Sequence, residues 1–162
     1  DGYIAKPDDD LSFLDIVQAE GEDYGYHQFV DSIDTVIIGR KTHEWVLNQV
    51  GSTPHPSKVC YVITRAERPS EGNTHFYSGN LETLVATLKG KEGKDIYCDG
   101  GAEVVNTLLR ANLLDEIILS VIPVMVGEGI RLFQDGRPEQ NLHLVSSQAF
   151  ASGLVQLHYR IG

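Results

Sequence analysis

Val36-Ile37-Ile38-Gly39-Arg40-Lys41-Thr42 is the stretch of sequence that decides the fold. Three β-branched apolar residues run without polar alternation into a glycine, which predicts a strand that is buried on both faces and ends in a turn. Two cations follow, and Thr42 is expected to cap a new helix. The stretch therefore predicts a strand-to-helix unit, the building block of a parallel sheet with crossover helices.

Apolar strand patterns and helical patterns continue to alternate after this stretch, as in a parallel α/β sheet. The expected strands are residues 59–64, 95–98 and 116–124, and the expected helices are residues 42–50, 81–88 and 102–113. The last two segments, 142–150 and 154–161, alternate polar and apolar residues around Ala151-Ser152-Gly153, which is typical of an antiparallel hairpin. The sequence thus predicts an α/β fold: a mixed, mostly parallel sheet flanked by helices, with a C-terminal antiparallel hairpin.

The composition is that of an acidic globular protein. Of 162 residues, 41% are hydrophobic and 22% charged, and the net charge at pH 7 is −10. We expect one domain over residues 1–162, since a single core usually stops growing only beyond about 250 residues. Nucleic acids and anionic membranes attract basic proteins, so neither is an expected partner. No apolar stretch approaches the roughly 20 residues of a membrane helix.

The two cysteines, Cys60 and Cys98, each lie inside an apolar run. Buried structural thiols are expected there rather than a disulfide framework, and a cytoplasmic protein fits this usage. No signal-peptide pattern opens the chain. The chain starts at Asp1 without a methionine, and we expect that residues preceding Asp1 are missing from it.

Three strand ends carry residues that suit an anionic ligand. They are the Gly39 turn with its two cations, the pair Thr64-Arg65, and, within residues 97–104, the paired glycines Gly100-Gly101 followed by the small residue Ala102. Glycines let a backbone approach a phosphate, and a helix N-terminus favours negative charge. Each motif alone is also explained by an ordinary turn or a solvated strand end. Because all three follow successive strands, we expect them to line one crevice.

The order of these motifs resembles the dihydrofolate-reductase superfamily, in particular the stand-alone branch similar to the C-terminal domain of the riboflavin-biosynthesis reductase. The resemblance extends from the opening residues 1–5 to the closing hairpin. It is carried by Gly39-Arg40-Lys41-Thr42, Gly100-Gly101, Asp115-Glu116, Pro123-Val124-Met125-Val126-Gly127-Glu128-Gly129 and Leu132-Phe133.

The resemblance implies NADPH as the cofactor. The residues implied on the 2'-phosphate and adenosine side are Gly39, Arg40, Lys41, Thr42, Thr64 and Arg65. Those implied on the pyrophosphate and nicotinamide side are Gly100, Gly101, Ala102, Glu103 and Val104, with Ile4 and Ala5 near the nicotinamide. Glu103 differs from the other residues of this set, because an acidic side chain beside a pyrophosphate is unfavourable unless it points away.

Two residues are candidates for the substrate site. Asp23 takes the place of the acid that assists protonation of the pterin in dihydrofolate reductases, and burial would raise the pKa of such a carboxyl. An aspartate that caps the helix running to Ile33 is the simpler interpretation. Ser120 faces the substrate if it corresponds to a family threonine, and is otherwise a core serine bonded to backbone.

No metal site is expected. The run Asp8-Asp9-Asp10 follows a proline in a loop, where adjacent carboxylates are usually solvated, and the six histidines show no ligand spacing. The resemblance implies a reductase that transfers hydride from NADPH, with 5-amino-6-(5-phosphoribosylamino)uracil as the leading substrate. Dihydrofolate or another pterin is the alternative substrate, and a nucleotide-binding module without turnover is the alternative class. A small-molecule substrate and a homodimer are the expected partners.

Overall fold

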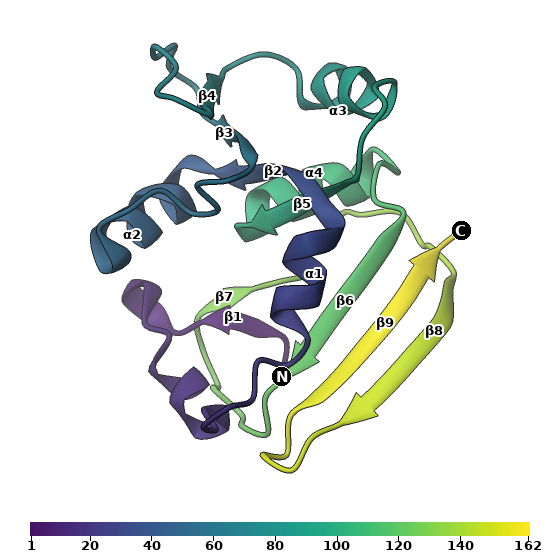
Figure 1. Cartoon of the computed structure of the whole chain (residues 1–162). Coiled ribbons are helices and arrows are strands. Elements are labelled where there is room, and N and C mark those ends of the chain that lie inside the picture. Colours follow the sequence, from purple (N-terminus) through teal and green to yellow (C-terminus); the bar gives the residue numbers. More distant parts are fainter. The chain divides into compact units, whose positions relative to one another are not determined.

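The computed structural model describes the whole chain, Asp1–Gly162. Internal contacts divide it into two compact units. One unit is the continuous segment Asp23–Ala111, and the other combines Asp1–Glu22 with Asn112–Gly162. We refer to them as the central unit and the terminal unit, and describe each by itself (Figure 1). The expectation of one domain stays a prediction.

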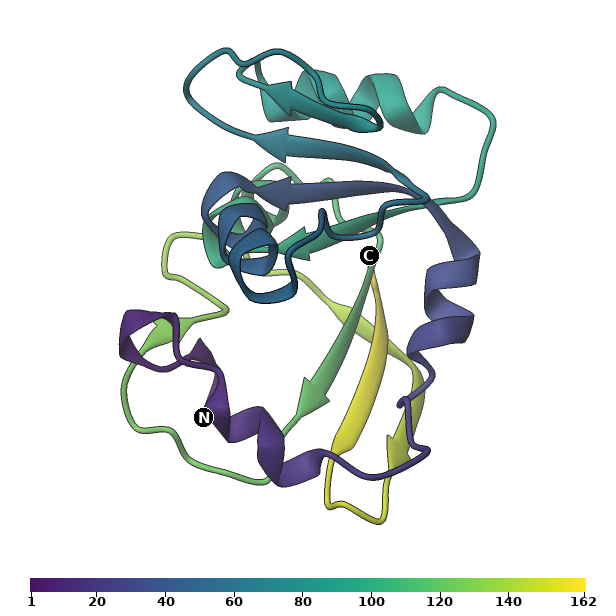
Figure 2. The same cartoon turned by 60° about the vertical axis from the view of Figure 1, so that its left-hand side comes forward.

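The central unit is built on a four-stranded parallel sheet. Its strands lie in the order β4-β3-β2-β5, so β2 is covered by a neighbour on each side. All three neighbouring pairs are parallel, and the carboxyl ends of the strands therefore meet at one edge, as Figure 2 shows. The strands are β2 (Ile33–Gly39), β3 (Val59–Ile63), β4 (Thr74–Tyr77) and β5 (Asp95–Gly100).

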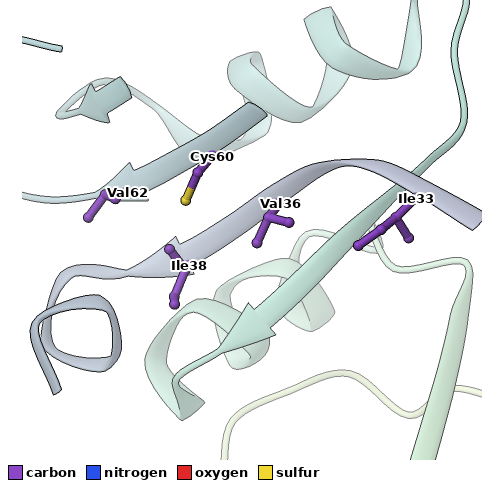
Figure 3. Packing of buried hydrophobic residues seen from close by; sticks show 5 residues of the cluster. All are labelled: Ile33, Val36, Ile38, Cys60 and Val62. Atoms are coloured by element: carbon purple, nitrogen blue, oxygen red, sulfur yellow. The ribbon is translucent and has the colours of Figure 1, made fainter. Parts of the chain in front are cut away.

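The core of this unit lies on β2 and β3. Val36 and Ile38 are fully buried on β2, and Cys60 and Val62 are buried beside them on β3. Figure 3 shows Val36 and Ile38 projecting from the same face of β2. Ile37, which points to the other face, is only 1% exposed. Burial on both faces confirms the strand expected from the uninterrupted apolar run.

Four helices connect or flank these strands: α1 (Tyr26–Ser32), α2 (Arg40–Val50), α3 (Leu81–Lys89) and α4 (Ala102–Arg110). α2 contacts β2 and β3, while α4 contacts β2 and β5. Asn80 caps α3, because its side chain accepts a hydrogen bond from the backbone N–H of Thr83 at 2.9 Å. The expected cap of α2 was wrong: the helix already begins at Arg40, with Gly39 at the cap position, so Thr42 lies inside the first turn.

The terminal unit contains two antiparallel sheets. β1 (Tyr3–Ala5) pairs with β7 (Ile130–Arg131), and β6, β9 and β8 form a second sheet in that order. The bounds are β6 (Glu116–Val121), β8 (Leu142–Ala149) and β9 (Val155–Ile161), with two short 3-10 helices, η1 (Pro7–Asp9) and η2 (Ser12–Val17). No helix of the chain has the length and apolarity that crossing a bilayer needs.

The predicted fold class is confirmed: parallel strands with helices come first, and an antiparallel hairpin closes the chain. The strands divide by hydrogen bonding into three sheets, and two strands, β4 and β7, were not expected from sequence. The predicted strand at 116–124 ends at Val121, and the predicted helix at 102–113 ends at Arg110.

His43 is an unusual member of the buried interior. It lies on α2, is only 4% exposed, and packs edge-on against Phe76 with ring centroids 6.0 Å apart. Neither ring nitrogen has a hydrogen-bond partner. Burial lowers the pKa of this imidazole from its ordinary value of 6.5, and the nearby carboxylates of Glu44 and Glu71 only partly oppose the shift.

The His43 environment predicts a specific loss of stability in acid. Below pH 6.5 the imidazole of His43 binds a proton in the unfolded chain but not in the folded chain, where its pKa is lower. The free energy of unfolding therefore falls as the pH drops through that value. His43→Leu should remove this component, so that the parent loses stability relative to the variant between pH 7.5 and pH 5.5. Urea unfolding of both proteins at the two pH values measures the difference.

Candidate functional site

The parallel sheet of the central unit places three turns at one edge. β2, β3 and β5 end at Gly39, Ile63 and Gly100, and the turn residues follow directly. Ile38 pairs with Gly100, and Gly39 pairs with Ile63, so the three strand ends are adjacent. The structure thus brings together the three motifs that the sequence offered as binding turns. This is the edge at which open α/β sheets bind ligands.

The turns after β2 and β5 pack closely against each other. A Cβ added to Gly39 would lie 3.3 Å from the backbone nitrogen of Gly101 and 3.3 Å from Cγ2 of Val104. A Cβ on Gly101 would lie 2.9 Å from Oγ1 of Thr42. Glycine at positions 39 and 101 therefore allows two backbone turns and the first turn of α2 to meet without side chains between them.

Gly100 presents an open backbone at the same place. Its φ is +93°, which glycine alone adopts readily, and a Cβ there would meet no atom within 4 Å. The Gly100-Gly101 peptide is cis. α4 begins at the next residue, and the first N–H groups of a helix have no intrahelical acceptor. An open glycine beside a helix N-terminus suits a pyrophosphate.

Cations lie beside these turns, and most of them have an acidic partner. Glu44 accepts hydrogen bonds from both Arg40 and Arg68, the latter at 3.3 Å. The Arg68 guanidinium also lies 5.6 Å from the centroid of the Phe76 ring. Lys41 is exposed and forms no ion pair. Arg68 was not identified from the sequence, because it lies in an irregular segment with no motif around it.

Arg65 and Glu103 link the ends of the two strands that flank β2. Arg65 Nη2 lies 3.3 Å from Glu103 Oε1, and both side chains are more than 80% exposed. Such an exposed pair contributes little stability but reduces the negative charge that Glu103 places beside the turn. Thr64 is buried at the end of β3, where its hydroxyl accepts a hydrogen bond from the backbone N–H of Ala66.

Asp23 lies at the start of α1. Its carboxylate accepts hydrogen bonds from the backbone N–H groups of Gly25 and His27 and from the His27 ring. The backbone hydrogen bond from His27 is the largest cause that lowers the pKa of Asp23. A proton donor needs a raised pKa, so this geometry favours the capping interpretation. The catalytic role of Asp23 stays a prediction.

Three other predicted residues lie in the terminal unit. Ile4 and Ala5 form β1, and a Cβ on Gly129 would lie 2.0 Å from the carbonyl oxygen of Ala5. The Gly-Glu-Gly loop of the resemblance thus packs on the opening strand. Ser120 is exposed on β6, and its hydroxyl accepts a hydrogen bond from Gln156 at 3.4 Å, so the interpretation as a core serine is wrong. The proposed cofactor and substrate roles of these residues stay predictions.

A second group of side chains at this edge was missed in the sequence. Asp99, the residue before the paired glycines, bonds to His55 and to Tyr97. His55 is 44 residues away in sequence and lies in a loop, so no spacing rule connects it to Asp99. Asp99 itself offered a signal, because a carboxylate at the end of a buried strand suits chemistry better than packing.

The two cysteines are free thiols. Burial is the main reason that the pKa of each thiol, Cys60 and Cys98, rises to about 11. Thiols with such pKa values are protonated at neutral pH and react slowly, because the thiolate is the nucleophile. This agrees with the structural role expected from their apolar surroundings.

Comparison with known proteins assigns the chain to one family. The family model of the RibD C-terminal domain matches residues 1–156. The chain is 39% identical over 160 residues to the uncharacterized protein YwjB of Bacillus subtilis, covering 98% of this chain and 91% of that protein. It is 34% identical to the uncharacterized protein YyaP of the same organism, covering 85% of this chain and 79% of YyaP. The chain belongs to the RibD C-terminal domain family, as the resemblance implied.

Solved structures agree with this assignment. A crystal structure of a candidate riboflavin biosynthesis protein from Shewanella sp. PV-4 has a TM-score of 0.91 and 26% identity, covering 100% of this chain and 93% of that one. RibD of Acinetobacter baumannii has a TM-score of 0.69 and 14% identity, and the match covers 99% of this chain and 55% of that protein. The second likeness shows the shared fold.

The contact between Gly39 and the turn at Gly101 predicts a coupled effect on stability. Gly39→Ala should destabilise the protein by about 1–3 kcal/mol, because the new methyl group overpacks the backbone of Gly101 and the side chain of Val104. Val104→Ala in the same chain should recover part of this loss, giving a coupling energy of about 0.5–3 kcal/mol in urea unfolding. Val105→Ala is the matched control, since that buried valine is not among the atoms nearest the new methyl group. Equal coupling for both valines would contradict the contact.

Proposed function

We propose that this protein is an NADPH-dependent reductase of the riboflavin-biosynthesis type, with 5-amino-6-(5-phosphoribosylamino)uracil as its preferred substrate. The observation that carries the proposal is the packing of Gly39 on Gly101 at the carboxyl edge of the sheet. It leaves an open backbone at Gly100 beside a helix N-terminus and beside cations. Membership of the RibD C-terminal domain family supports the same activity.

The residues at this edge fit the two charged parts of NADPH. The start of α4 and the glycine turn suit the pyrophosphate, because helix N–H groups and a bare backbone both favour close approach of an anion. Arg40, Lys41 and Arg65 suit the 2'-phosphate. Arg40 donates a hydrogen bond to Glu44. A phosphate carries more negative charge than a carboxylate and would replace Glu44 as the partner of Arg40. Bound NADPH supplies the hydride, while the protein orients the reactants and supplies the proton.

The cations of this edge predict a preference for NADPH over NADH. Charge-assisted contacts to a phosphate contribute about 1.5–3 kcal/mol each, so the ratio of dissociation constants should exceed tenfold. Arg40→Ala should reduce this ratio while changing NADH affinity little, as measured by calorimetric titration. Lys91→Ala is the control: it removes one positive charge from an exposed position outside the site and should leave the ratio unchanged. Equal dissociation constants for NADPH and NADH would contradict the assignment of this edge as the 2'-phosphate site.

One experiment separates the candidate activities. The purified protein is mixed with NADPH and, in parallel, with the phosphoribosylamino-pyrimidine, with dihydrofolate and with other pterins, and NADPH oxidation is followed by absorbance. The proposal predicts turnover with the phosphoribosylamino-pyrimidine at a kcat/KM at least tenfold above that of any pterin. Faster turnover of a pterin would make the protein a pterin reductase. Tight NADPH binding without any turnover would make it a nucleotide-binding module.

Two broader properties belong to the same proposal. We propose a cytoplasmic location, which the free thiols of Cys60 and Cys98 support, since reducing compartments keep thiols unpaired. We also propose a homodimer. β8 is an edge strand that pairs only with β9, and its exposed apolar residues, Leu142, Leu144 and Val145, offer a surface to a second copy.

A further inference from the structure

Asp99 is the centre of a hydrogen-bonded group in the central unit. Its Oδ1 accepts a hydrogen bond from the Tyr97 hydroxyl at 2.8 Å. Its Oδ2 lies 3.2 Å from Nε2 of His55. Tyr97 and Asp99 both belong to β5, whereas His55 belongs to the loop between α2 and β3. One carboxylate thus holds a phenol and an imidazole at the same time.

The group is sheltered from solvent. The side chain of His55 is 7% exposed and that of Asp99 is 23% exposed. The His55 ring lies edge-on to Tyr97 with centroids 5.8 Å apart, and Tyr26 of α1 lies 6.4 Å away on centroids. The titratable groups that face His55 are therefore Asp99 and Tyr97 from β5 and Tyr26 from α1. Hydrogen bonds in such sheltered positions are stronger than those in water.

The two partners of Asp99 have different roles. Burial, together with the charge of Asp99, raises the pKa of Tyr97, so the phenol keeps its proton and acts as a hydrogen-bond donor. That hydrogen bond occupies Oδ1 and leaves Oδ2 to the imidazole. A carboxylate bonded to one ring nitrogen of a histidine fixes the orientation of the ring. The hydrogen bond between His55 and Asp99 uses Nε2, so the proton of Nδ1 is not committed to Asp99.

The position of the group connects it to the turn proposed for the cofactor. Asp99 is the residue immediately before Gly100-Gly101, so the backbone that suits the pyrophosphate continues directly into the carboxylate. Reduction of a carbonyl or imine by hydride also needs a proton for the oxygen or nitrogen. Among the ionisable side chains, imidazole is the one whose ordinary pKa suits proton donation near neutral pH.

We propose that His55 is the proton donor of the reduction and that Asp99 and Tyr97 are positioning residues that hold its ring; this inference rests on the proposed function. Hydride from the reduced nicotinamide forms a bond to the carbonyl or imine carbon, and the π electron pair moves to the oxygen or nitrogen. That atom takes the proton from Nδ1 of His55. The imidazole is left neutral and regains a proton from water, and the oxidised cofactor is the other product.

The test compares His55→Gln with the parent in single-turnover reactions at saturating NADPH and substrate. Glutamine can still donate a hydrogen bond to Asp99 but cannot act as an acid, so the rate should fall by about 10²–10⁴-fold. KM and the dissociation constant for NADPH should stay within threefold. His75→Gln, a solvent-accessible histidine of β4, is the control and should match the parent.

A second measurement tests the group without turnover. The NMR signals of the His55 ring nitrogens are compared in the parent, in Asp99→Asn and in Tyr97→Phe. Asp99→Asn should move the Nε2 signal, because this nitrogen loses its carboxylate partner. Tyr97→Phe should move it less, since the carboxylate of Asp99 is retained.

The outcomes separate this inference from the proposed function. Parent turnover with a His55→Gln rate within threefold would remove His55 from the mechanism and leave the reductase intact. An unmoved Nε2 signal of His55 in Asp99→Asn would overturn the role of Asp99 whatever the activity. Failure of the parent to oxidise NADPH with any substrate would overturn the function, and this inference with it.

Discussion

The burial of β2 on both faces is the constraint on which the central unit depends. A strand with Val36, Ile37 and Ile38 almost completely hidden must have a neighbour on each side, because its backbone polar groups have no access to water. β3 and β5 supply these hydrogen bonds in parallel, and parallel pairing forces every connection to cross over through a helix or a long segment. After each of these strands, the chain therefore emerges at the same edge of the sheet, the one formed by the carboxyl ends of the strands.

That shared edge determines what the turns can be. The turns after β2 and β5 are adjacent: a Cβ on Gly39 would press on the backbone of Gly101 and on Val104, and a Cβ on Gly101 would press on the hydroxyl of Thr42. Close packing of these turns alone therefore favours glycine at positions 39 and 101, whether or not a ligand binds there. Once the backbone is bare, however, the start of α4 is left accessible from the side of Gly100, and the helix dipole favours an anion there. Close packing and the close approach of an anionic ligand both favour glycine in these turns. The sequence pattern alone therefore could not distinguish the two roles.

Most of the fold of the central unit could be predicted, because its strands are apolar runs and its helices have amphipathic spacing. β4 could not: Thr74-His75-Phe76-Tyr77 has four residues, no apolar run, and pairs only with β3 at the sheet edge. β7 has two residues and exists through its pairing with β1. The position of the three candidate binding turns was predictable because each follows a strand. His55 was not, because its meeting with Asp99 depends on the path of the loop after α2, which no local pattern encodes.

The same geometry explains why a proton donor would have to come from outside the turns. The glycine turn itself carries no side chain that could act as the acid. The nearest side chain on β5 is Asp99, whose carboxylate accepts two hydrogen bonds and is therefore suited to holding a donor in place. A loop that returns from the helix after β2 passes the end of β5 and brings an imidazole to this carboxylate. One sheltered carboxylate thus holds an imidazole beside the turn proposed for the cofactor.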